Sequence, residues 1–225
     1  MSTAVVALAD AGDPPHFDVI VPGLALGNEV AAHDRALLRE RGVVAMINAT
    51  QRDNPWAELL RKRGVACMQV AVEDRRTVEL YPFFEPCCAF ITRALEAAAG
   101  ASSAATSPCV LVHCEMGTSR SVTIVVAYLM ASFRLTLREA LNFVLDHRPP
   151  SSPYTHPNPA FLMQLVRWEA SLGLVPPGGS PSLEFLEYAQ GAAVEWNGRN
   201  RGPCAAAGCR CGALPTPTEE AEGRG

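Results

Sequence analysis

The sequence predicts an α/β domain in which a central, mostly parallel sheet carries helices on both faces. Short apolar runs alternate with stretches of helical periodicity over most of residues 14–174. Residues 43–47 (VVAMI) form a continuous apolar run, as expected of a strand that is covered on both faces. Residues 119–133 place apolar side chains all round a helix, as expected of a helix buried at the centre of such a fold.

The domain opens with two short apolar runs, at residues 17–21 and 24–26, which we expect to pair as strands. Asn28 is suited to cap a helix that continues to about Arg41. Gly42 is a stop signal for that helix, because glycine readily adopts the left-handed conformation found after helix ends. The strand expected at residues 43–47 then follows directly.

In the middle of the domain, expected helices and strands continue to alternate. We expect a helix around residues 55–63 that ends at Gly64, and then a strand over residues 65–72. A long helix covers about residues 82–99. The small, polar residues 100–107 after it indicate an inserted loop rather than a domain boundary.

Helix signals are clear in the last third of the domain. Thr136 and Glu139 have the spacing of a capping box, so a helix begins there. That helix must stop before the proline pair at 149–150, because the residue before a proline is disfavoured in helical geometry. Asn158 followed by Pro159 at the first helical position predicts the start of a final helix.

Composition restricts the class of protein. The formal net charge of the 225 residues is −4, so no basic field indicates nucleic acid as a partner. No apolar run reaches the roughly 18 residues needed to span a bilayer. The first residues lack the basic stretch of a signal peptide, and Ser2 stands where N-myristoylation requires glycine. Eight cysteines without an export signal indicate reduced thiols and a cytoplasmic location, with the nucleus and the oligomeric state left open.

We expect three parts along the chain: a flexible leader at residues 1–13, the α/β domain at 14–174 and a C-terminal extension at 175–225. Within the extension, residues 182–196 have the pattern of one amphipathic helix, and the remainder, rich in Gly, Ala, Pro and Glu, predicts disorder. Three cysteines of this remainder fit no standard zinc spacing, so zinc binding or acylation is the less favoured interpretation. They are Cys204, Cys209 and Cys211.

One segment, residues 110–121 (VLVHCEMGTSRS), has an arrangement suited to phosphate chemistry. A short apolar strand at residues 109–112 runs into a loop that opens a helix, with Cys114 at the start of the loop and Arg120 in the first helical turn. Such a loop can point backbone N–H groups into one concavity, and the helix N-terminus adds about half a positive charge there. Gly117 permits the backbone geometry that this loop needs.

Each residue type at this site has a chemical use. The positive environment favours the thiolate form of Cys114, which would be nucleophilic near neutral pH. Arg120 offers a bidentate guanidinium to phosphoryl oxygens, so we expect neither a metal nor a cofactor. Ser121 can donate its hydroxyl to the sulfur and ease departure of the thiolate, and we expect His113 to brace the loop by hydrogen bonding. The remaining residues expected to bind substrate are Glu115, Met116, Gly117, Thr118 and Ser119.

The motif His113-Cys114-x5-Arg120-Ser121 resembles the active site of the protein tyrosine phosphatase superfamily. The residues around it resemble the dual-specificity phosphatase branch, in particular its small, atypical members. Further segments that resemble the family's motifs are Leu24-Ala-Leu-Gly27, Ile47-Asn-Ala-Thr50, His156-Pro-Asn-Pro-Ala-Phe161 and Gln164-Leu165. The likeness spans most of the chain and implies the protein tyrosine phosphatase-like fold.

The resemblance also implies a general acid on the loop after the strand at residues 65–72, where Asp74 aligns with the family's acid. This carboxyl would protonate the leaving oxygen and later take a proton from the attacking water. Asp74 precedes Cys114 by more residues than is usual in this family, and the insertion at 100–107 supplies the excess. Glu73 and Asp53 are rival carboxylates, and a solvated loop carboxylate is the alternative interpretation of Asp74.

The activity implied is metal-independent hydrolysis of phosphotyrosine and phosphoserine/threonine in phosphoprotein substrates, through a phosphocysteine intermediate. A phosphatase for phosphoinositides or RNA 5′-phosphates is one alternative, but Glu115 would repel a polyanion and the chain is slightly acidic. An inactive phosphate-binding member is the other alternative. Such members usually lose the nucleophile or the arginine, and both Cys114 and Arg120 are present.

An ionised Cys114 would also be sensitive to oxidation, so we expect oxidants to inactivate it reversibly. Cys87, Cys88 and Cys109 are candidate partners for a disulfide with Cys114, although the sequence gives no distances. Cys109 and Cys67 otherwise have the pattern of small buried apolar residues.

Overall fold

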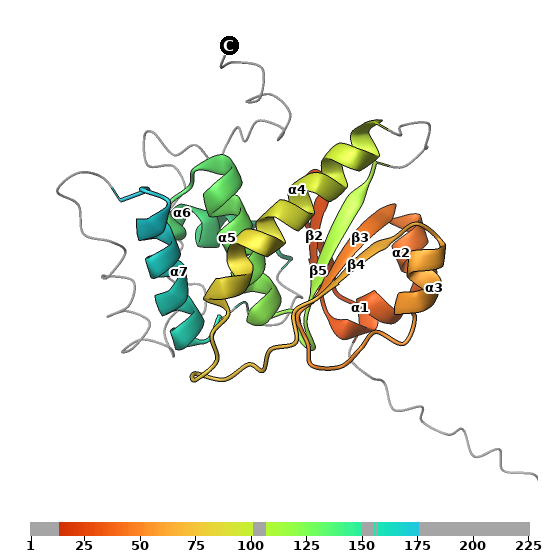
Figure 1. The fold of residues 1–225 in the computed structure, drawn as a ribbon, viewed down its shortest axis with the longest axis horizontal. Coiled ribbons are helices and arrows are strands. Elements are labelled where there is room, and N and C mark those ends of the chain that lie inside the picture. The colour runs from red at the N-terminus through yellow and green to blue at the C-terminus, as the bar shows by residue number, and fades with distance from the viewer. Residues whose placement is uncertain (1–13, 101–106, 150–154, 156, 176–225) are drawn as a thin grey trace, which may run out of the picture.

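Figure 1 shows a computed structural model of the chain, which describes residues 14–100, 107–149, 155 and 157–175. The leader expected at residues 1–13 lies outside the described residues. The same holds for all but the first residue of the extension expected at 175–225, including the helix at 182–196 and its three cysteines. Most of the insertion expected at 100–107 is outside them as well.

The centre of the fold is a five-stranded sheet with the order β1-β2-β5-β3-β4. The strands are β1 (Phe17–Val21), β2 (Leu24–Gly27), β3 (Val43–Asn48), β4 (Ala66–Gln69) and β5 (Cys109–His113). β1 and β2 pair antiparallel, and the neighbours β2 and β5, β5 and β3, and β3 and β4 all pair in parallel. The expected mostly parallel sheet is therefore confirmed, with the antiparallel strand at one edge.

Helices cover both faces of the sheet (Figure 1). One face carries the short helices α1 (Glu29–His33), α2 (Arg35–Glu40) and α3 (Ala57–Lys62). The other face carries α4 (Phe84–Gly100), α5 (Arg120–Phe133), α6 (Leu137–Asp146) and α7 (Pro159–Ser171), with the 3₁₀ turn η1 (Tyr81–Phe83) leading into α4. The domain thus has three layers, as an α/β pattern implies.

Side chains of the central strands alternate between two apolar clusters, because successive strand residues point to opposite faces. In β5, Val110 and Val112 belong to the larger cluster with α4–α7, whereas Leu111 belongs to the smaller one with α2 and α3. Residues 120–130 of α5 are all buried, which confirms the central helix. Within the described residues, no single helix is long and apolar enough to cross a membrane. Taken together, α5 and α6 are long and apolar enough, but the pair is bent by 119° at the break between them.

The helix expected at residues 28–41 is two helices, which is a correction. Asp34 separates them, because its carboxylate accepts hydrogen bonds from the backbone N–H groups of Ala36 and Leu37, each at 3.0 Å. The Asp34 backbone N–H closes the preceding helix by donating to Ala31 O. Short acidic side chains compete for backbone N–H groups in this way, and apolar periodicity carries no sign of it.

The strand expected at residues 65–72 is shorter, since β4 ends at Gln69. The backbone N–H of Val70 still donates to Asn48 O at 2.8 Å, and that of Val72 donates to Val70 O, so the chain turns out of the ladder here. Both side chains remain buried. This departure carries the following residues across the carboxyl ends of the parallel strands.

The helix starts expected from capping signals are confirmed. In α6, Thr136 and Glu139 form a reciprocal capping box, with the Thr136 backbone N–H donating to Glu139 Oε2 at 2.8 Å. In α7, Asn158 Oδ1 accepts a hydrogen bond from the Phe161 backbone N–H at 3.0 Å. These caps fix where both helices begin, and the second of them places Asn158 beside the candidate active site.

Candidate active site

The loop after β5 lies at the carboxyl ends of the parallel strands, where α/β folds commonly bind ligands. Cys114 opens the loop and is 1% exposed, and Ser119 closes it as the residue before α5. Within the described part of the chain, the backbone N–H groups of residues 115–119 donate to no other residue. Five unpartnered donors beside a helix N-terminus form the kind of concavity that binds a phosphate group.

The loop is held in shape by contacts on its outer side. Gly117 has φ +71°, and a Cβ atom there would lie 2.8 Å from Gly27 O, so only glycine fits. The carbonyl oxygen of Glu115 accepts a hydrogen bond from the Glu29 backbone N–H at 3.0 Å. The carbonyl oxygen of Gly117 accepts one from Arg148 Nη1 at 2.9 Å. Two carbonyl oxygens of the loop are therefore hydrogen-bonded to groups outside the loop, which hold its backbone in place.

Cys114 and Ser121 face each other across the loop, with 3.2 Å between Sγ and Oγ. Ser121 is fully buried in the first turn of α5, so its hydroxyl has little freedom to turn elsewhere. This arrangement fits a hydroxyl that donates to the sulfur when the sulfur carries negative charge.

Arg120 is buried and its guanidinium is fixed at both ends. Nη1 donates to Val72 O at 3.1 Å, and Nη2 donates to Glu115 Oε2 at 3.1 Å. Glu115 in turn accepts a hydrogen bond from Arg52 Nη2, which also pairs with Glu29. The loop carboxylate therefore lies between two arginines, one of which is the expected phosphate ligand.

Asp74 lies beside this arginine, with 3.8 Å between Asp74 Oδ2 and Arg120 Nε. Its other oxygen, Oδ1, accepts hydrogen bonds from Ser119 Oγ at 3.0 Å and from Asn158 Nδ2 at 2.6 Å. Ser119 Oγ also accepts from the Asn158 backbone N–H at 3.0 Å. Asp74, Ser119 and Asn158 thus form one network that holds the carboxyl group over the loop.

The rival carboxylates lack such contacts. Glu73 pairs instead with Arg75, with 2.6 Å between Oε2 and Nε. Among the described residues, Asp53 makes no ion pair or side-chain hydrogen bond with the loop. Of the three candidates, only Asp74 is joined to the phosphate loop.

His113 is buried at 1% exposure directly before the loop. Burial lowers the pKa of its imidazole to about 4, although the nearby Cys114 backbone offsets part of this shift. By distance and angle, neither ring nitrogen has a hydrogen-bond partner among the described residues, and the bracing role expected of this side chain stays a prediction.

The remaining loop side chains lie at the rim. Met116 is 48% exposed and Thr118 is half-buried. Glu115 and Met116 border a recess of about 660 Å³ beside the loop. The rest of its lining is Glu29, Val30, His33 and Arg52. The rim therefore presents two carboxylates and one arginine next to the nucleophile.

Sequence reasoning missed two residues that shape the site. Arg148 is buried, donates to Gly117 O, and pairs with Asp18 at 2.9 Å between Nε and Oδ2. Asn158 was expected only as a helix cap but also binds Asp74. The Pro-Asn segment that resembles a family motif could have indicated a role for Asn158 in the site. For Arg148, the only feature in the sequence is its position directly before the proline pair.

The candidate disulfide partners of Cys114 are poorly suited to that role. Burial raises the pKa of the Cys87, Cys88 and Cys109 thiols to about 12, so none is readily ionised. Cys109 also lies at the opposite end of β5 from Cys114. All five described cysteines are free, and no group of three or more His, Cys, Asp or Glu side chains in the described ranges is arranged to hold a metal ion.

Comparisons with known proteins agree with this geometry. Residues 24–171 match the family profile described as dual specificity phosphatase, catalytic domain. Human dual specificity protein phosphatase 26 is 36% identical over 158 residues, which cover 70% of this chain and 69% of that protein. Human dual specificity phosphatase 28 is 36% identical over 159 residues, covering 71% of this chain and 81% of that one.

Solved structures similar to this chain also include dual specificity phosphatases. The crystal structure of human DUSP28 is 33% identical with a TM-score of 0.58, and the match covers 72% of this chain and 97% of that one. A mouse putative dual specificity phosphatase, crystallised in complex with zinc tungstate, is 32% identical with a TM-score of 0.58 over 75% and 97% of the two chains. Both likenesses extend over the whole α/β domain rather than over the loop alone.

Proposed function

Because the chain belongs to the dual-specificity phosphatase family and is a protein phosphatase, we propose that it hydrolyses phosphotyrosine and phosphoserine/threonine in proteins through a phosphocysteine intermediate on Cys114. The observation that carries the proposal is the meeting of three groups at one loop. These are the Cys114 sulfur, the fixed guanidinium of Arg120 and the tethered carboxyl of Asp74. Five N–H groups that have no acceptor among the described residues complete the site.

Substrate binding uses the charges of the loop. The phosphoryl oxygens accept hydrogen bonds from the N–H groups of residues 115–119 and from Arg120, which keeps its bond to Val72 O. The phosphate replaces the Glu115 carboxylate on Nη2, and Glu115 keeps its pairing with Arg52. These donors stabilise the equatorial oxygens in the transition state, so the proposed reaction needs no metal ion.

In the first step, Cys114 Sγ attacks phosphorus as the P–O bond to the substrate breaks. Asp74 gives its proton to the leaving oxygen, which departs as a phenol or alcohol. The product is a phosphoryl group bonded to Cys114 and an ionised Asp74. The partial positive charge at the N-terminus of α5 lies beside the Cys114 sulfur that makes this attack, since Ser121 in the first helical turn is 3.2 Å from Sγ.

In the second step, water attacks phosphorus and Asp74 takes a proton from that water. The S–P bond breaks, and Ser121 Oγ, 3.2 Å from Sγ, donates its hydrogen bond to the departing sulfur. Inorganic phosphate leaves, and both Cys114 and Asp74 return to their starting states. One carboxyl group thus serves as acid and then as base.

A protein substrate suits the rim better than a polyanion does. The Glu29 and Glu115 carboxylates flank the loop, and close like charges oppose the binding of additional phosphates. Exposed Met116 provides an apolar contact for residues next to the phosphorylated one. The phosphoinositide and RNA 5′-phosphate alternatives are correspondingly disfavoured.

The test measures phosphate release from a phosphotyrosine peptide, a phosphothreonine peptide, a phosphoinositide and an RNA 5′-phosphate, each with excess chelator. We expect the wild type to hydrolyse both peptides, Cys114→Ser to hydrolyse nothing while still binding tungstate, and Cys67→Ser to match the wild type. Cys67 is a suitable control because it lies on β4 away from the loop. Turnover that persists in Cys114→Ser, or that the chelator abolishes, would overturn the mechanism.

A further inference from the structure

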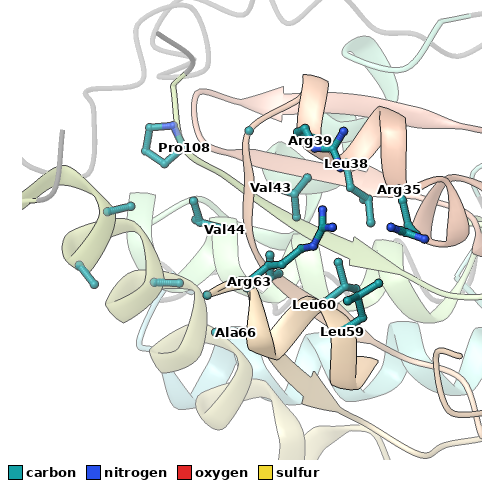
Figure 2. A pocket seen from close by; sticks show the side chains of 16 residues that line it. Arg35, Leu38, Arg39, Val43, Val44, Leu59, Leu60, Arg63, Ala66 and Pro108 are labelled. Carbon is teal, nitrogen blue, oxygen red and sulfur yellow. The ribbon is translucent and has the colours of Figure 1, made fainter. Parts of the chain in front are cut away.

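A second recess, of about 620 Å³, is shown from close by in Figure 2. It lies where β3 begins, at Val43, and where Pro108 leads into β5. Cys114 follows the other end of β5. A strand of five residues spans roughly 15–20 Å, so the recess and the nucleophile are separated by about that distance.

The floor of this recess is apolar, and its edge is basic. Leucine and valine side chains from α2, β3 and α3 form the floor, and alanines of α4 form one wall. Figure 2 shows Arg35, Arg39 and Arg63 extending around Val43 and the nearby leucines. No residue that lines the recess is acidic. We call this feature the arginine groove, defined by Arg35, Arg39, Arg63, Leu38, Leu60 and Val43.

The three arginines differ from their neighbours on α3 in having no acidic partner in the part of the chain that the structure describes. Among the described residues, none of Arg35, Arg39 and Arg63 forms an ion pair, whereas Arg61 and Lys62 both pair with Glu58 on their own helix. Arg35 instead lies over the Trp56 ring, 5.1 Å from its centroid. These guanidinium groups, without an acidic partner in the described ranges, form a local basic patch on a chain whose net charge is −4.

From this combination we infer that the arginine groove is a docking site for an acidic peptide segment of a partner protein, one that places an apolar side chain beside its carboxylates. The guanidinium groups bind carboxylates in a bidentate manner, and the apolar floor accepts a side chain such as leucine. Charge complementarity selects this occupant. The apolar floor and the net negative charge of the chain oppose RNA, whose binding needs a wide basic surface.

A role for the arginine groove in selecting substrates rests on the proposed function. A phosphoprotein bound through such a segment would hold its phosphorylated residue at an elevated effective concentration near Cys114. The linker must cross the length of the sheet, so about six or more extended residues must separate the acidic segment from the phosphorylated residue. Docking would then lower the KM for substrates with that spacing and leave the chemical step unchanged.

The first experiment measures binding by fluorescence anisotropy with the full chain and a labelled peptide of alternating glutamate and leucine. We expect Arg63→Glu to weaken binding by about fivefold or more. Arg93→Glu makes the same charge change on exposed α4 outside the groove, and we expect less than a twofold effect. Ala97→Trp fills the groove without changing charge and should weaken binding as much as Arg63→Glu.

The second experiment compares turnover of a small aryl phosphate with that of a phosphopeptide joined to the acidic segment. We expect Arg63→Glu and Ala97→Trp to raise the KM for the joined substrate alone. No peptide binding by the wild type, equal losses in Arg93→Glu, or a dimer that Arg63→Glu dissociates would overturn the docking site. Absence of aryl phosphate turnover by the wild type would instead overturn the proposed function, and the binding result would stand by itself.

Discussion

Replacing Asp74 by asparagine removes the acidic proton of this side chain while keeping its position. Asparagine retains the oxygen that accepts hydrogen bonds from Ser119 Oγ at 3.0 Å and Asn158 Nδ2 at 2.6 Å. The variant cannot give a proton to the leaving oxygen, a transfer that contributes about 10²–10⁴ in rate, and it also loses the base for the second step and the carboxylate charge 3.8 Å from Arg120 Nε. At about 1.4 kcal/mol per factor of ten, the barrier rises by about 3–5 kcal/mol. We expect kcat for phosphopeptides to fall by that factor.

The dependence on the leaving group is the sharper measurement. Acidic phenols depart without a proton, so the loss in Asp74→Asn should shrink along a series of aryl phosphates with increasingly acidic phenols. Glu73→Gln is the matched control, because that carboxylate is paired with Arg75, and its kcat should equal that of the wild type. An equal loss along the whole series, or a comparable loss in Asp53→Asn instead, would refute Asp74 as the acid.

Three further predictions follow from the same site. Ser121→Ala should slow breakdown of the phosphocysteine about tenfold or more, seen as a larger burst of alcohol release, because Oγ lies 3.2 Å from the Cys114 sulfur. Gly117→Ala should lower the free energy of unfolding by about 1–3 kcal/mol in urea titration, because φ is +71° and the new Cβ would meet Gly27 O. The pKa of buried His113 is lowered to about 4 in the folded state. The unfolded chain therefore binds its proton more readily, and stability should fall by about 2 kcal/mol between pH 7 and pH 5.

Each of these predictions has a contrary outcome. A Ser121→Ala variant with an unchanged burst would remove the hydroxyl from the second step. A Gly117→Ala variant as stable as the wild type would show that the loop can shift away from Gly27. His113→Asn should lose the part of the pH dependence due to the imidazole, and an identical slope in this variant would assign that part to other groups.

Local signals in the sequence predicted most of the fold and the nucleophile. Apolar runs in the sequence predict the strands because such runs directly indicate burial. The starts of α6 and α7 are predictable because each capping side chain lies within three residues of the backbone N–H group that donates to it. The same holds for Cys114, Arg120 and Ser121, which lie within eight consecutive residues. Within such a segment, spacing alone determines which groups meet.

Long-range contacts were beyond sequence reasoning. Asn158 binds Asp74 from 84 positions away, and Arg148 pairs with Asp18 from 130 positions away. Both contacts depend on how packed elements meet in space, which residue types and spacing do not encode. The break at Asp34 is local, but it reflects competition between a side chain and the helix for the same N–H groups.

Transfer of the phosphoryl group to the Cys114 sulfur is the central step of the proposed reaction, and trapping that group tests it directly. Enzyme mixed with a radiolabelled phosphopeptide is quenched in acid within the first turnover, digested, and mapped by mass spectrometry. The account predicts label on Cys114 in the wild type, more label in Ser121→Ala and none in Cys114→Ser. Label on another residue, or full turnover by Ser121→Ala without any covalent label, would contradict it.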